Sequence, residues 1–170
     1  NMDNLRYLDD IMPANVYTIH SNKHVLKSLL PKIDLLIGAV LVVGAKAPKL
    51  ITRELLSLMQ PGSVVVDVSV DQGGCIETTK PTTHKNPTFV EENITHYCVA
   101  NMPGAVPYTS TIALTNATFS YVKTLANNGI SVFKNNKTLL AGLNTINGKI
   151  THKAVADSFN LDYHNPLEHI

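Results

Sequence analysis

The sequence has few of the features that mark disulfide-rich, membrane-spanning or nucleic-acid-binding proteins. It contains no tryptophan and only two cysteines, Cys75 and Cys98, which cannot form a disulfide framework. Its 14 basic and 13 acidic residues give a formal net charge of +1, which provides no basic field for nucleic acid. The longest apolar run, residues 35–45, is too short to cross a bilayer, and no apolar signal segment occurs in the first twenty residues. We therefore expect a cytoplasmic protein that binds neither nucleic acid nor membrane.

Short apolar segments typical of strands alternate with segments of helical periodicity in the first two thirds of the chain. Residues 33–40 and 64–68 are almost continuously apolar, as in parallel strands that are covered on both faces. This alternation predicts an α/β domain with a doubly wound parallel sheet over residues 1–107. The predicted strands are residues 16–20, 33–40, 64–68 and 95–100, and the predicted helices are residues 2–12, 22–30 and 53–59, the last capped by Thr52.

The pattern changes after the two prolines at positions 103 and 107. Residues 109–127 carry regularly spaced apolar side chains without a helix breaker, and Gly129 follows them closely, so we expect one long helix. One or two short helices and a last helix at residues 151–159 should follow. Between the predicted strands, residues 71–92 contain two glycines and two prolines and are expected to form a long polar connection.

The residues that follow each predicted strand are the candidates for chemistry, because open parallel sheets bind ligands at the carboxyl ends of their strands. Small residues and backbone groups dominate these segments, which suits a flat cofactor. Asp71 ends a strand and could act as an acid or base or hold a ribose or an amine. From residue type alone, a turn in which Asp71 accepts the N–H of Gly73 or Gly74 is favoured. Asp67 is expected to be a structural carboxylate, and the Asn101 amide either binds a ligand or closes a turn.

Other reactive side chains occur without the partners that their chemistry needs. His20 and His24 are four residues apart, but no glutamate accompanies them in the zinc-binding pattern, so we expect no metal site. Cys75 has no nearby histidine or lysine to activate its thiol. Lys49, with its neighbour Lys46, could meet a phosphate, although a solvated loop is favoured. The glycine fingerprint of dinucleotide-binding turns, G-x-G-x-x-G, is absent.

Several segments spread over nearly the whole chain carry a resemblance to a known family. They are residues 37–41, 44–50, 66–75, 80–84, 97–107, 110–118 and 142–145, and they include the motifs Gly-Ala-Lys-Ala-Pro-Lys-Leu and Asp-Gln-Gly-Gly-Cys. Together these segments resemble the alanine dehydrogenase and pyridine nucleotide transhydrogenase family. The second motif favours the dehydrogenase branch.

The resemblance implies an oxidoreductase that converts L-alanine reversibly to pyruvate and ammonia with NAD, in a homo-oligomer that is usually a hexamer. It also implies that Asp71 is the catalytic residue and that the strand ends line the NAD site. The implied NAD-binding residues are Ser21, Val40, Leu41, Val68, Ser69, Val70, Asp71, Val99, Ala100, Asn101 and Met102. These are the strand-end segments that the sheet argument also selects.

The resemblance further implies that part of the family's architecture precedes residue 1. Residues 1–107 would be the C-terminal part of the NAD-binding domain, an incomplete Rossmann-type sheet with its third to sixth strands. Residues 108–170 would be the connecting helix and the C-terminal helices of the substrate domain. The family's glycine loop and its substrate-binding arginine, lysine and histidine would lie in a missing N-terminal half, in the same or another chain. We therefore expect the isolated 170-residue chain to be inactive and residues 33–40 to expose an apolar sheet edge.

Two alternative functions remain open at the level of sequence. A transhydrogenase-type NAD-binding subunit would transfer hydride between nucleotides without alanine. A truncated, non-catalytic binding or assembly module would at most contribute to an oligomer. Binding of NAD without turnover favours the module, and turnover restored by the missing half favours the split enzyme.

Overall fold

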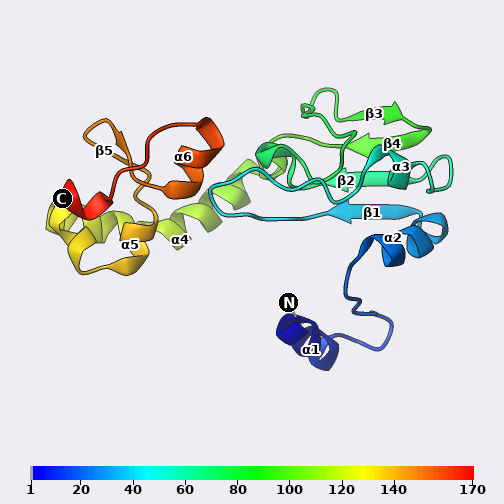
Figure 1. The fold of residues 1–170 in the computed structure, drawn as a ribbon, viewed down its shortest axis with the longest axis horizontal. Coiled ribbons are helices and arrows are strands. Elements are labelled where there is room, and N and C mark those ends of the chain that lie inside the picture. The colour runs from blue at the N-terminus through cyan, green and yellow to red at the C-terminus, as the bar shows by residue number, and fades with distance from the viewer. Residues whose placement is uncertain (1) are drawn as a thin grey trace.

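The computed structural model describes residues 2–170 as a mixed α/β fold followed by a helical region (Figure 1). The helices are α1 (Met2–Ile11), α2 (Lys23–Leu29), α3 (Arg53–Leu56), α4 (Pro107–Asn128), α5 (Lys137–Ala141) and α6 (Lys153–Phe159). The strands are β1 (Leu35–Gly38), β2 (Val64–Asp67), β3 (Thr88–Glu91), β4 (Ile94–Tyr97), β5 (Thr145–Ile146) and β6 (Lys149–Ile150). Among the described residues, no helix has the length and apolar character that crossing a bilayer requires.

The main sheet has four strands in the order β1-β2-β4-β3. β1 pairs in parallel with β2, β2 pairs in parallel with β4, and β3 is antiparallel to β4. Three of these strands, β1, β2 and β4, were predicted, and the mostly parallel sheet confirms the predicted fold class. Because the parallel strands all point the same way, their carboxyl ends lie along one edge of the sheet.

The hydrophobic core forms between the sheet and the helices α2 and α3. Leu55 and Leu56 of α3 pack with Val65 of β2, Ile94 of β4 and the buried Ile76. Thr52 caps α3 as predicted, since its hydroxyl oxygen accepts the Leu55 N–H at 3.3 Å. The helix ends at residue 56, three residues before the predicted end.

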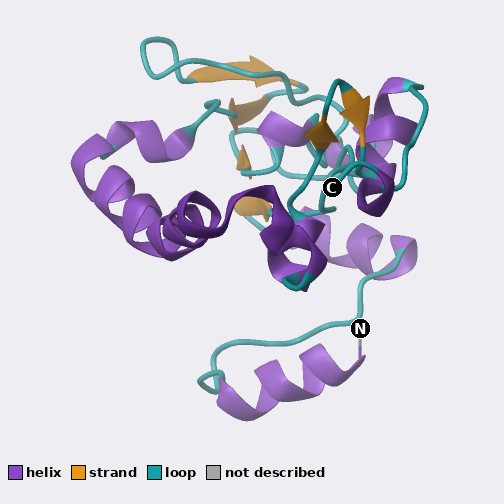
Figure 2. Ribbon diagram, turned by 90° about the vertical axis from the view of Figure 1, so that its left-hand side faces the viewer, coloured by secondary structure: helices purple, strands orange, loops and turns teal. Residues whose placement is uncertain are grey.

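The predicted strand at residues 16–20 is wrong. These residues run in an extended conformation without ladder partners among the described residues, and Tyr17 is 83% exposed. β-branched composition favours a strand only where a neighbouring strand supplies hydrogen bonds. Figures 1 and 2 show α1 apart from the sheet, connected to α2 by this extended segment.

Two short hairpins were not predicted. β3 lies inside the segment expected to be a polar connection, and Glu92 and Asn93 join it to β4 with φ of 55° and 60°. β5 and β6 are joined by Asn147 and Gly148, a pair that favours tight hairpins and that the helical prediction overlooked. The long helix, α4, is confirmed and is two residues longer at its amino end and one at its carboxyl end than the predicted 109–127.

Candidate functional site

The carboxyl ends of β1 and β2 are joined by two hydrogen bonds. The Val40 N–H donates to the Ser69 hydroxyl oxygen at 2.8 Å. The Val68 N–H donates to the Gly38 carbonyl oxygen at 2.8 Å. A side chain on Gly38 would overlap the Cys75 sulfur, with a Cβ only 2.4 Å away, so glycine permits this close approach. Two of the predicted strand-end segments therefore form one surface.

Asp71 connects the ends of β2 and β4. Its carboxylate oxygen Oδ2 accepts the Asn101 N–H at 3.2 Å, and the Asp71 side chain is exposed. The turn expected from residue type is wrong, because Gly73 N–H donates to the Val70 carbonyl oxygen and Gly74 N–H to that of Ser69. Asp71 is thus held at the site by a residue thirty positions away and keeps Oδ1 available.

The strand-end surface contains two adjoining pockets. The first has a volume of about 300 Å³ and is lined by Ala39, Val40, Leu41, Val68, Ser69, Asp71 and Gln72. The second, of about 490 Å³, is lined by Ser21 and Val40 among others, so the residues that follow the extended segment reach the same edge. Five of the predicted NAD-binding residues thus share the first pocket, and Ser21 shares the second with one of them.

The remaining predicted site residues lie outside these two pockets. Val70 and Val99 are buried, so they offer backbone groups only. Asn101 lines a separate pocket of about 620 Å³ beside the start of α4, and Met102 begins the short helical turn that follows. Ala100 is partly buried, and its N–H donates to the Thr82 carbonyl oxygen at 3.1 Å.

Asp67 organises the loop that carries Asp71. Its buried carboxylate accepts the N–H groups of Ser69, Cys75 and Ile76, at 3.0, 2.9 and 3.2 Å, and the hydroxyl of Thr79 at 2.8 Å. Its side chain is fully buried, so these four donors replace the water that a charged carboxylate requires. The expectation of a structural carboxylate is confirmed.

Lys49 and the cysteines support the site rather than react in it. The Lys49 ammonium donates to the carbonyl oxygens of Gly73 at 2.6 Å and Ile76 at 3.2 Å, which holds the glycine loop in place. Burial raises the pKa of the Cys75 thiol, and the charge of Asp67 adds to this effect. Burial also raises the pKa of Cys98 to about 11, so both thiols stay protonated near neutral pH.

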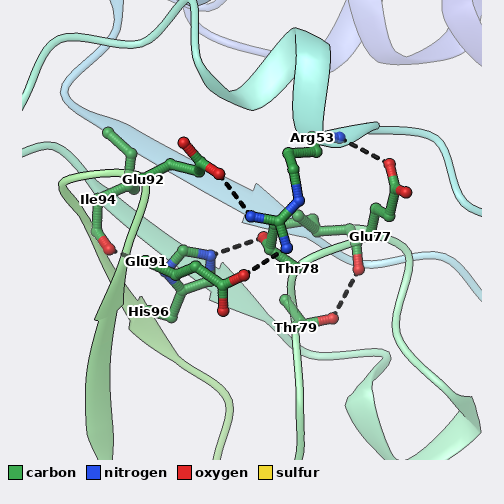
Figure 3. A network of polar contacts seen from close by, with 9 residues as sticks. Arg53, Glu77, Thr78, Thr79, Glu91, Glu92, Ile94 and His96 are labelled. Carbon is green, nitrogen blue, oxygen red and sulfur yellow. Dashed lines mark hydrogen bonds and ion pairs between the residues drawn. The ribbon is translucent and has the colours of Figure 1, made fainter.

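A separate polar network lies towards the amino end of β4 (Figure 3). Arg53 of α3 pairs with Glu91 and Glu92 at the β3–β4 turn. His96 is buried in β4, where its Nδ1–H donates to the Ile94 carbonyl oxygen at 2.8 Å and its Nε2 accepts the Thr78 hydroxyl at 2.8 Å. This network tightens the sheet, and both ring nitrogens of His96 are occupied, so it offers no group for catalysis.

Two further residues, Ala39 and Gln72, line the first pocket but were not among the implied NAD-binding residues. Both fall within the strand-end segments 38–41 and 68–74, so position was the available signal. Gln72 Oε1 is buried and has no hydrogen-bond partner among the described residues. Nothing in the sequence indicates this unpaired oxygen.

Comparisons with known proteins identify close relatives over nearly the whole chain. Residues 1–153 match the family described as "Alanine dehydrogenase/PNT, C-terminal domain". An alanine dehydrogenase of Halomonas elongata is 54% identical over 160 residues, which cover 94% of this chain and 43% of that protein. An alanine dehydrogenase of Staphylococcus haemolyticus is 52% identical over 165 residues, covering 96% of this chain and 44% of that protein.

Solved structures agree with the sequence comparison. A structure named L-alanine dehydrogenase has a TM-score of 0.80 and 44% identity, covering 94% of this chain and 44% of its own. The structure of a transhydrogenase from Sinorhizobium meliloti has a TM-score of 0.54 and 27% identity, covering 60% of this chain and 30% of its own. The chain spans less than half the length of these relatives. On this evidence the chain belongs to the alanine dehydrogenase and pyridine nucleotide transhydrogenase family and corresponds to a C-terminal portion of its members.

Proposed function

We propose that this chain supplies part of the NAD site and the catalytic aspartate of an alanine dehydrogenase, which converts L-alanine reversibly to pyruvate and ammonia. Family membership implies a pyridine nucleotide cofactor. NAD is our specific proposal, supported by the similarity to the alanine dehydrogenases. The observation that carries the proposal is the exposed Asp71 carboxylate at the rim of the first strand-end pocket, fixed by Asn101.

The residues of the strand ends fit a dinucleotide. Apolar side chains of Val40, Leu41 and Val68 form the walls of the first pocket, which suits the faces of a flat ring. The neighbouring pocket continues along the same edge towards Ser21, so an extended ligand can cross the ends of β1 and β2. We propose that Ser21, Val40, Leu41, residues 68–71 and residues 99–102 hold the cofactor.

The division of chemistry follows from these positions. When bound, NAD accepts the hydride released from the substrate carbon. Asp71 carries a negative charge that can hold the substrate ammonium group or accept a proton from the water that attacks the imine. The Asn101 N–H fixes one carboxylate oxygen, so the other is presented in a defined direction.

We also propose that the remaining substrate-binding groups come from an N-terminal half, in the same or another chain, and that the protein acts as a cytoplasmic homohexamer. The match to less than half of each relative supports a contribution from further sequence. The wide exposure of apolar side chains on α4, with Leu114 at 66% and Val122 at 61%, supports a partner for that helix.

Turnover of alanine tests the proposal. The intact protein, meaning this chain together with the proposed N-terminal half, should form NADH from NAD when L-alanine is added. Asp71→Asn should lower its kcat by about 10²–10⁴-fold, the usual contribution of general acid–base catalysis. Asp162→Asn is the matched control, because Asp162 is exposed and lies outside the strand-end pockets. Equal activity of Asp71→Asn and Asp162→Asn contradicts the assigned role.

A transhydrogenase function is the second candidate, favoured by the structural similarity to the Sinorhizobium meliloti transhydrogenase. It predicts hydride transfer from NADH to a nicotinamide analogue in the absence of alanine. We expect the intact protein to show alanine-dependent transfer only. Hydride transfer from NADH to the analogue without alanine assigns the chain to the transhydrogenase branch.

A further inference from the structure

The C-terminal helical region meets the loop after β1 at Gly44. Gly44 adopts a left-handed conformation with φ of 72°. A Cβ on Gly44 would lie 2.5 Å from Cε1 and 2.9 Å from Nδ1 of His152, the residue that precedes α6. The ring of His152 therefore packs directly on the backbone of this turn, and only glycine leaves room for it.

The loop that contains Gly44 connects to two residues that line the first strand-end pocket. It begins immediately after Leu41, which lines that pocket. The Ala45 N–H closes a turn on the Val42 carbonyl oxygen at 3.1 Å. Two residues later, the Ala47 N–H donates to the carbonyl oxygen of Gln72 at 2.9 Å, and Gln72 lines the same pocket as Leu41 and Asp71. A displacement of the turn at Gly44 would move both Leu41 and Gln72.

His152 is held there by packing rather than by its own hydrogen bonds. Its Nδ1 is buried and has no partner among residues 2–170. The only other buried side-chain nitrogen or oxygen without a partner in this described range is Oε1 of Gln72, the residue whose carbonyl oxygen accepts the Ala47 N–H. A buried unpaired nitrogen is unfavourable, so the contact persists because the ring fills the space against Gly44.

We propose that His152 is a positioning residue for the nucleotide site: its ring holds the turn of residues 42–45 and thereby fixes Leu41 and Gln72 at the pocket. Through this contact the C-terminal helical region helps to shape a site built on the sheet. The inference rests on the proposed function, because it takes the strand-end pocket as the place where NADH binds.

Replacement of His152 in the intact protein tests the inference, with hydrogen exchange of residues 42–47 and NADH affinity as readouts. His152→Ala should speed exchange of these amides. If the turn is then correctly placed for about one tenth of the time, the apparent Kd for NADH rises about tenfold. His152→Phe keeps the ring without the unpaired nitrogen and should retain both slow exchange and wild-type affinity.

A methyl group on Gly44 tests the same contact from the other side. Gly44→Ala should weaken NADH binding, because the methyl displaces the His152 ring. Gly148→Ala is the matched control, since Gly148 has nearly the same φ, 74°, and nothing within 4 Å of its Cβ position. It introduces the same backbone strain without the clash and should leave NADH affinity unchanged. In the His152→Ala background, Gly44→Ala should have a smaller additional effect.

The outcomes distinguish failure of the positioning role of His152 from failure of the proposed function. Unchanged exchange and affinity in His152→Ala overturn the inference, and so does a Gly44→Ala effect no larger than that of Gly148→Ala. Weak NADH binding by His152→Phe as well as His152→Ala means that the ring nitrogen acts directly, which also overturns a packing role. If the wild-type protein does not bind NADH, the proposed function fails, and with it the role of His152 at a nucleotide site, whereas the exchange rates still report whether His152 holds the turn.

Discussion

Two aspartates four residues apart show how surroundings divide similar side chains between structure and chemistry. Asp67 is fully buried and meets four donors, whereas Asp71 is exposed and meets one backbone N–H, that of Asn101 in the segment after β4. Sequence position predicted the first role, because a carboxylate inside an apolar strand must be satisfied internally. It could not predict the partner of Asp71, since the pairing with Asn101 depends on how β2 and β4 align.

Substitution of Asp67 should destabilise the fold far more than substitution of Asp71. Asp67→Asn places an amide NH₂ group against backbone N–H donors, and the donors left unsatisfied should cost at least about 3 kcal/mol of unfolding free energy. Asp71→Asn keeps an oxygen for the Asn101 N–H and should change stability by less than about 0.5 kcal/mol. Urea unfolding of both variants measures this, and similar midpoints contradict the assignment.

The buried thiols should make the fold sensitive to alkaline pH. The pKa values of Cys75 and Cys98 are raised above their ordinary value of 9.0, that of Cys98 to about 11. The unfolded chain therefore loses these protons first, so the stabilisation is complete below pH 9 and is lost as pH rises towards 11. Urea midpoints across this range should fall less in Cys98→Val than in the wild type. A parallel decline in both contradicts the role of Cys98.

At the scale of elements, the sequence predicted what local pattern controls. Helical spacing predicted α2 and α4, and continuous apolar runs predicted β1 and β2. Strands whose formation depends on a partner strand were harder to predict. Residues 16–20 have strand composition but no neighbour, and β3 pairs through a turn at residues 92–93 that lacks the usual glycine.

Arg53 should link α3 to the β3–β4 hairpin in a pH-dependent way. Its hydrogen bond lowers the pKa of Glu91 below the ordinary 4.5. A lowered carboxyl pKa gives stability that is present above pH 4.5 and lost as pH falls through the lower, folded value.

Arg53→Met should therefore lower the urea midpoint near neutral pH and reduce the further loss on acidification. Arg6→Met is the matched control, because Arg6 forms an exposed pair with Asp3 within α1, away from the β3–β4 hairpin. An acid transition of Arg53→Met as steep as that of the wild type would rule out this role for the ion pair.

At the scale of the whole molecule, apolar side chains remain exposed on three elements. Leu35 and Ile37 on the outer strand β1 are 52% and 57% exposed, as the predicted open sheet edge requires. α4 buries no residue within the described part of the chain, and α1 lies apart from the sheet. Exposed strand edges and apolar helix faces favour association.

The 170-residue chain on its own should therefore self-associate and form no NADH from alanine. Addition of the part of the Halomonas elongata relative that lies outside the match should reduce self-association and permit turnover, because it would cover these surfaces and supply the remaining groups. Light scattering and NADH formation follow the two effects. Alanine-dependent turnover by the isolated chain contradicts the proposed need for an N-terminal half.

The central claim is that the nucleotide binds at the carboxyl ends of β1, β2 and β4. Titration of the isotopically labelled intact protein with NADH, followed by amide NMR, tests it most directly. We expect the signals of Leu41, Ser69 and Asn101 to shift, while those of Gly62 and Asn93, in turns at the opposite end of the strands, stay in place. Shifts confined to Gly62 and Asn93, or no shifts at saturating NADH, would contradict the claim.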